Sequence, residues 1–180
     1  YKYLNRQGLS DAESYAELDA VLEQGQKIQQ QMSPNNPNYL RFHYDYLYAL
    51  DFRGRSKAVI ENFTQLNIPL EKLPAYVRHA IADSYLAEQK PKQAELAYKT
   101  LLNEKNYPDM IVYTGLYYSY IEQEKYKEAE QLLAKVDHLI PTYKYSQAKG
   151  VDKTSHPDRD DYIALKGMHL AYANHLDQAE

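Results

Sequence analysis

The sequence contains no cysteine and no tryptophan, and only 6 of its 180 residues are glycine. The absence of cysteine excludes a disulfide framework and every metal centre with thiolate ligands. No apolar run is long enough to cross a bilayer, and the mean hydropathy is −0.74. Neither a glycine-rich phosphate loop nor an H-E-x-x-H zinc motif occurs. We therefore expect a protein that is not an enzyme and that uses no cofactor and no metal.

Charge and aromatic content narrow the class of partner. The chain has 21 Lys and Arg against 25 Asp and Glu, a formal net charge of −4. A nucleic-acid-binding surface needs a basic stripe, so this balance argues against nucleic acid as a partner. The chain has 20 Tyr but only 3 Phe. Helical repeats use some Tyr for packing, but 20 exceed that need, so we expect some to face a ligand or partner.

Residues 74–102 show how the chain is organised. Pro74 suits the first position of a helix, and Pro91 opens a second helix after a short turn. The apolar residues recur at helical spacing on one face of each helix: Ile81, Ala82 and Tyr85, then Ala94, Ala97, Tyr98 and Leu101. A small residue on each helix allows close approach. This is the pattern of one tetratricopeptide (TPR) repeat.

The small residue recurs along the chain. Ala58, Ala94 and Ala129 are separated by 36 and 35 residues, close to the TPR period of about 34. Gly54 marks the turn before a helix over 56–66, and Asp45 stands where this pattern expects an apolar residue. We therefore predict an all-α fold, a right-handed TPR superhelix of antiparallel helix pairs.

The predicted segments follow from this period. They are a C-terminal helix of a preceding repeat with a linker at 1–36, a TPR-like repeat at 37–73, repeats at 74–107 and 108–141, an inserted loop at 142–158 and a truncated repeat at 159–180. The helical pattern continues to the last residue. We therefore expect the sequence to be a fragment of a longer protein.

The candidate binding residues follow from helical spacing. In TPR arrays the first helix of each pair lines a concave groove. If Ile81, Ala82 and Tyr85 pack, the opposite face of the same helix carries ligand-binding candidates. These are Tyr76, His79 and Asp83, and the same rule gives His43, Tyr44, Leu47 and Asp51 in the preceding repeat, Tyr118 and Glu122 in the following one, and Tyr172 in the last. Each complete repeat thus offers a Tyr ring and a carboxylate.

These residue types suit particular ligands. Lys and Arg, which bind the carboxylate of a peptide tail in some TPR grooves, are absent from these positions. Tyr rings stack on the C–H faces of sugars, and rings and carboxylates attract cations. A cation–π contact contributes about 0.5–1 kcal/mol and an exposed ion pair about 0.2–1 kcal/mol, so affinity requires a polymer that spans several repeats. The alternatives are that these Tyr residues pack between helices, or that the groove holds a protein.

The second repeat carries a more specific resemblance. The segments PAYVR at 74–78 and ADSYL at 82–86, followed by Pro91 and Ala94, resemble the PAYxR, ADxYL and PxxA signature of one family. That family is the PgaA/HmsH group of poly-N-acetylglucosamine export porins, and the signature lies in its periplasmic TPR region. Residues 51–60 resemble the preceding repeat of the same family. Tyr76, Arg78 and Asp83 are not expected at packing positions, so they carry most of the resemblance.

The resemblance implies a function and a location. It implies a non-catalytic periplasmic domain of a bacterial outer-membrane protein, which binds partly deacetylated poly-N-acetylglucosamine and guides it to the porin during biofilm formation. The segment itself would not insert into the membrane. Deacetylation leaves protonated amines, which an acidic, Tyr-rich groove suits. A second implied partner is the periplasmic deacetylase lipoprotein, so the alternative is a protein–protein scaffold that docks this enzyme.

Overall fold

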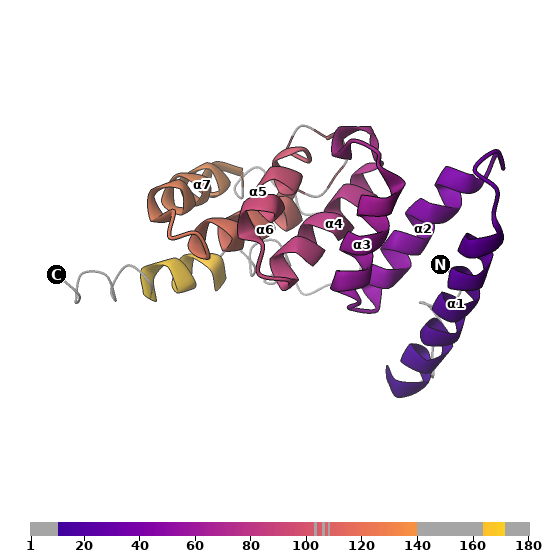
Figure 1. The fold of residues 1–180 in the computed structure, drawn as a ribbon. Helices are drawn as coiled ribbons and strands as arrows, with labels where there is room; N and C mark the ends of the chain where they lie inside the picture. The colour runs from indigo at the N-terminus through magenta and orange to yellow at the C-terminus, as the bar shows by residue number, and fades with distance from the viewer. Residues whose placement is uncertain (1–10, 103, 106, 108, 140–163, 172–180) are drawn as a thin grey trace, which may run out of the picture. The chain divides into compact units, whose positions relative to one another are not determined.

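A computed structural model describes residues 11–102, 104–105, 107, 109–139 and 164–171 (Figure 1). Every regular element in these ranges is a helix, and they contain no strand, which confirms the predicted all-α class. The elements are α1 (Asp11–Gln31), α2 (Tyr39–Phe52), α3 (Ser56–Leu66), the short 3-10 helix η1 (Leu70–Lys72), α4 (Ala75–Ala87), α5 (Pro91–Lys99), α6 (Asp109–Ile121) and α7 (Tyr126–Leu139). Residues 164–171 are also helical.

The chain divides into two compact units between Lys90 and Pro91. Each unit is considered separately below. The TPR superhelix depends on how successive helix pairs stack, so it stays a prediction, as do the repeat boundaries. The predicted loop at 142–158 and the candidate Tyr172 lie outside the described residues.

In the first unit, α1 runs antiparallel to α2 (Figure 1). Two contacts fix this direction: Arg53 donates two hydrogen bonds of 2.8 Å to the Asp19 carboxylate, and the Tyr46 hydroxyl donates to the Leu22 carbonyl at 3.4 Å. Helix α3 folds back on α2, and α4 packs on both. The core between these helices is apolar and consists of Leu22, Leu47, Leu50, Val59, Leu73, Val77 and Ile81.

In the second unit, α6 packs on α5 and on α7. Helices α5 and α6 come close because residue 115 is glycine: a Cβ there would lie 2.1 Å from the Tyr98 ring. Ala94, Ala97 and Ala129 are fully buried, as the small-residue pattern predicted. The Glu95 carboxylate accepts hydrogen bonds from Lys99, Gln123 and Lys125 and so ties α5 to the turn that follows α6.

The repeat appears in the backbone of three helix-ending turns. One residue in each turn has a left-handed conformation, and these residues lie 35 positions apart: Gly54 (φ 72°), Gln89 (φ 53°) and Glu124 (φ 57°). In each turn the next N–H donates to the carbonyl five residues earlier: Arg55 to Leu50 at 2.9 Å, Lys90 to Tyr85 at 2.8 Å and Lys125 to Tyr120 at 2.9 Å. This is the Schellman geometry that ends many helices. The 35-residue repeat is therefore present in local structure as well as in sequence.

The turns predict opposite effects on stability of introducing glycine at residue 89 and of removing it at the equivalent residue 54. Gln89→Gly should raise the free energy of unfolding by about 0.5–1 kcal/mol, because glycine adopts a positive φ without the steric cost that a side chain brings. Gly54→Ala should lower it by about 1 kcal/mol for the same reason. Denaturant unfolding measures both. Glu88→Gly is the matched control: Glu88 has φ −90°, so glycine there brings no steric relief and should lower the stability of the protein. If Gln89→Gly lowers the stability as much as this control does, the prediction is wrong.

Candidate functional site

The candidate site lies where α2 and α4 run side by side in the same direction. Where the start of α4 lies beside the middle of α2, the Tyr76 hydroxyl donates to Asp45 Oδ1 at 2.9 Å, and the Tyr76 ring meets the Tyr48 ring edge-on at 5.6 Å between centroids. Further along both helices, the charge of Asp83 acts on Asp51. The parallel arrangement therefore produces one face with aromatic rings at one end and carboxyl groups at the other.

The aromatic end is a cavity of about 430 Å³, here called the tyrosine pocket. Its lining residues are Arg41, Tyr44, Asp45, Tyr48, Pro74 and Tyr76. Tyr44 and Tyr76 were candidates from the sequence, and the structure brings them into the same cavity. Tyr48, Asp45 and Arg41 were not candidates. The one available signal was the misfit of Asp45 in the first repeat, because a polar residue at an expected packing position often has a specific partner.

Asp45 holds the polar groups of this pocket in place. It accepts a hydrogen bond from Tyr76 and another, of 2.8 Å, from Arg41 Nε. Burial and the hydrogen bond to Asp45 raise the pKa of Tyr76 to about 12, so the phenol stays protonated and remains a donor. The face therefore does include one arginine, although its charge is already paired with Asp45 in an exposed i,i+4 bridge.

The opposite end of the face is a pair of carboxyl groups, Asp51 and Asp83, here called the carboxyl pair. Burial, and to a smaller extent the charge of Asp83, raise the pKa of Asp51 to about 7, and the nearby Ser84 hydroxyl opposes part of this change. His79 Nε2 lies 3.3 Å from Asp83 Oδ1. Burial lowers the pKa of His79 despite the neighbouring Asp83 charge, so the ring is neutral near pH 7. A cationic ligand here would favour the ionised form of Asp51.

The structure thus brings together five of the residues selected from the sequence: Tyr44, Asp51, Tyr76, His79 and Asp83. Their role in binding stays a prediction. In the second unit Tyr118 lies on the exposed surface of α6 and Glu122 is exposed in the turn that follows this helix; the Tyr118 hydroxyl is 3.7 Å from the Met168 sulfur.

Three expectations about side-chain direction were wrong. His43 and Leu47 were expected to face the groove, but they are 4% and 0% exposed. His43 lies on the side of α2 that contacts α1, and Leu47 is in the core between α2, α3 and α4. Arg78 was expected away from the packing positions, but it is only 5% exposed. Helical spacing correctly gives the angles between residues around the axis of α2. It gave the wrong rotation of this part of the helix about that axis, so His43 and Leu47 were assigned to the wrong face.

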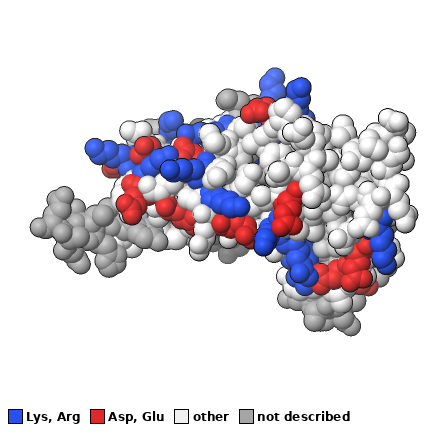
Figure 2. Space-filling view, in the orientation of Figure 1, with Lys and Arg blue, Asp and Glu red and all other residues white. Residues whose placement is uncertain are grey.

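The described residues contain neither a cluster of metal ligands nor a membrane-spanning helix. Within the described ranges, no three His, Asp or Glu residues are close enough to form a metal site. None of the helices described is both long and apolar enough to span a bilayer. On the face shown in Figure 2, basic and acidic side chains are interspersed and form no extended basic patch.

The raised pKa of Asp51 predicts a pH dependence of stability. A carboxyl group with a raised pKa contributes stability that is complete below its unfolded pKa of about 4 and is lost as the pH rises through about 7. Asp51→Asn should therefore leave stability nearly unchanged at pH 4 and raise it by about 1–2 kcal/mol at pH 8, after discounting for partial solvent contact. Denaturant unfolding at both pH values tests this, with Glu71→Gln on η1 as the exposed control. A variant whose advantage is equal at both pH values would contradict it.

The chain is similar to the poly-beta-1,6-N-acetyl-D-glucosamine export protein of Escherichia coli strain K12, with 30% identity over 141 residues. The protein of the same name in Escherichia coli O157:H7 gives the same identity. The alignment covers 74% of this chain but 17% of each relative, so the chain spans about one sixth of their length. No protein-family model matches the chain, and no solved structure does. The similarity supports the resemblance seen in residues 74–94, at the level of a segment related to a polysaccharide export protein.

Proposed function

We propose that this chain is a non-catalytic TPR module that binds partly deacetylated poly-N-acetylglucosamine. The binding face is the tyrosine pocket and the carboxyl pair on α2 and α4. In the proposed setting the module lies in the periplasm and guides the polymer toward an outer-membrane export porin. The observation that carries the proposal is that three Tyr rings and two carboxyl groups share one face of the first unit.

The tyrosine pocket supplies contacts for the sugar rings. The C–H face of a pyranose packs on an aromatic ring, and Tyr44, Tyr48 and Tyr76 surround a cavity of about 430 Å³. This volume lies within the range of small-molecule sites, about 300–1,000 Å³. The hydrogen bond from Tyr76 to Asp45 fixes the Tyr76 ring before any ligand arrives. Less conformational freedom is then lost on binding.

The carboxyl pair supplies the preference for free amines. Asp51 is largely buried beside the charge of Asp83, so its ionised form is disfavoured. A protonated glucosamine amine beside this pair would offset both effects, whereas an N-acetyl group carries no charge. The similarity to an export protein named for poly-beta-1,6-N-acetyl-D-glucosamine supports this class of polymer.

The repeated turns support the part of the proposal that assigns both units to a TPR array. Left-handed turn residues 35 positions apart are what successive TPR units would show. In the second unit, Tyr118 on α6 offers an exposed ring, and Glu122 in the turn after α6 offers a carboxylate. Because single contacts of this kind contribute about 1 kcal/mol or less, we assign the affinity to a polymer that occupies several such faces.

A protein-docking role is the alternative, with the periplasmic deacetylase as the partner. Exposed apolar side chains on α1 favour it: Val21 and Ile28 lie two helical turns apart and are 41% and 45% exposed. Retention of a protein, and of no sugar, in a pull-down with this chain would favour this alternative.

A titration with two oligosaccharides tests the proposal. A β-1,6-linked glucosamine pentamer should shift the ring resonances of His79 in NMR spectra, and high salt should weaken this binding. Asp83→Asn should weaken it about 5–10-fold without lowering the unfolding midpoint. Glu71→Gln removes a charge outside this face and is the control. An affinity that is equal in Asp83→Asn and the unsubstituted chain would contradict the proposed role of the carboxyl pair.

A further inference from the structure

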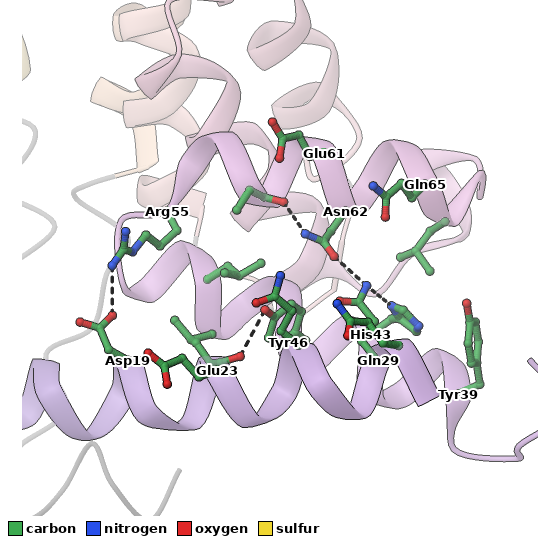
Figure 3. A pocket seen from close by; sticks show the side chains of 16 residues that line it. Asp19, Glu23, Gln29, Tyr39, His43, Tyr46, Arg55, Glu61, Asn62 and Gln65 are labelled. Atoms are coloured by element: carbon green, nitrogen blue, oxygen red, sulfur yellow. Dashed lines mark hydrogen bonds and ion pairs between the residues drawn. The ribbon is translucent and has the colours of Figure 1, made fainter. Parts of the chain in front are cut away.

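A second cavity lies on the opposite side of α2 from the tyrosine pocket. It has a volume of about 660 Å³ and lies between α1, α2 and α3, entirely within the first unit (Figure 3). Five carboxamide side chains line it, so we call it the amide pocket: Gln26, Gln29 and Gln30 of α1, and Asn62 and Gln65 of α3. The rings of Tyr39, His43 and Tyr46 come from α2.

The two cavities are separate because α2 has two faces. The residues of α2 in the amide pocket recur every three or four positions: Tyr39, His43, Tyr46 and Leu50. Those in the tyrosine pocket are turned about half a revolution away: Arg41, Tyr44, Asp45 and Tyr48. No residue lines both cavities. A ligand in one therefore leaves the contacts of the other unchanged.

An ordered chain of hydrogen bonds forms one wall of the amide pocket (Figure 3). Gln29 Nε2 donates to Asn62 Oδ1 at 2.7 Å and lies 3.3 Å from His43 Nδ1, and Asn62 Nδ2 donates to the Ala58 carbonyl at 2.8 Å. An amide nitrogen has only donors, so His43 Nδ1 is the acceptor. Burial lowers the pKa of His43 and keeps the ring neutral, which places its proton on Nε2.

This wall leaves hydrogen-bonding groups available. His43 Nε2 is buried and has no hydrogen-bond partner among the described residues. Both hydrogens of the Gln29 amide are used within the wall, which leaves its carbonyl oxygen as an acceptor. Gln26, Gln30 and Gln65 are exposed, and each offers both donors and an acceptor. The pocket therefore presents donors and acceptors in mixture.

The charges of the amide pocket exclude other ligand classes. The carboxylate of Asp19 is already bound to Arg53 and Arg55. Glu23 and Glu61 lie among the lining residues on the exposed surface, so an anionic ligand would be repelled. The carboxylates of the pocket are exposed or paired with arginine, and an exposed ion pair contributes only about 0.2–1 kcal/mol, so an amine gains less here than beside the half-buried carboxyl pair. The chemistry that fits is neutral and rich in both donors and acceptors.

We propose that the amide pocket binds N-acetylated hexosamine units. An acetamido group has one N–H donor and one carbonyl acceptor, which match the acceptor and donor of a side-chain carboxamide. The Tyr39 ring offers apolar surface to the sugar, the Tyr46 ring packs on Gly25 and closes the floor of the cavity, and a volume of about 660 Å³ accommodates more than one sugar ring. This inference rests on the proposed function and extends it: the two faces of α2 recognise the two kinds of unit in a partly deacetylated polymer.

Two histidines report the two sites separately. A fully N-acetylated β-1,6-linked pentamer should shift the NMR ring resonances of His43, in the amide pocket, at low and at high salt alike. The glucosamine pentamer should shift those of His79, beside the carboxyl pair, mainly at low salt. The double variant Gln26→Ala/Gln65→Ala should weaken binding of the acetylated pentamer about 5–10-fold and leave that of the glucosamine pentamer unchanged.

The matched control is Gln24→Ala/Gln31→Ala, which removes two exposed glutamines of α1 that do not line the pocket. It should bind both pentamers with unchanged affinity. His43 resonances that do not respond to the acetylated pentamer would overturn this inference, as would a response to a neutral peptide of equal length in place of the sugar. His79 resonances that do not respond to the glucosamine pentamer would instead contradict the proposed function, so the two failures are distinguishable.

Discussion

Helix α2 contacts three other helices of the first unit, and this constraint determines the role of each of its residues. Leu47 and Leu50 join the apolar core, Tyr46 faces α1, and Tyr48 faces the Tyr76 ring of α4. A helix enclosed in this way needs side chains that bury a large apolar surface and still satisfy polar groups near the surface. Tyrosine does both, because its ring packs while its hydroxyl reaches a partner. The high tyrosine content therefore has a structural cause.

The acidic residues of the proposed binding face differ in burial and in their partners. Asp45 has Arg41 and Tyr76 as partners, so its role is to fix the tyrosine pocket. Asp51 is more buried and has the charge of Asp83 beside it, and its pKa rises to about 7. Carboxyl groups with raised pKa values are frequent at functional sites. This contrast, more than the net negative charge of the chain, makes the carboxyl pair a better candidate than Asp45 for binding a cation.

Sequence reasoning succeeded where local rules determine the structure and failed where the rotation of a helix matters. Proline and glycine positions predicted α3 and the start of α5, and helical spacing placed Ile81 and Ala82 in buried positions. Spacing could not give the rotation of α2, because residues of nearly every direction around this helix are aromatic or apolar. The amide pocket could not be predicted either: Gln29 and Gln65 are 36 residues apart, and only the packing of α1, α2 and α3 brings them together.

The weakness of each contact is a requirement of the proposed function. A module that guides a polymer must release every sugar unit soon after binding it. A deep site with high affinity for one sugar would therefore stop the movement of the polymer. Exposed rings and carboxylates give contacts of about 1 kcal/mol or less, which exchange rapidly. A polymer with acetylated and deacetylated units would still dissociate wherever a run of one kind of unit meets a face that recognises only the other kind. Two chemically different faces on α2 remove this difficulty, because each kind of unit then finds a weak site on the same helix.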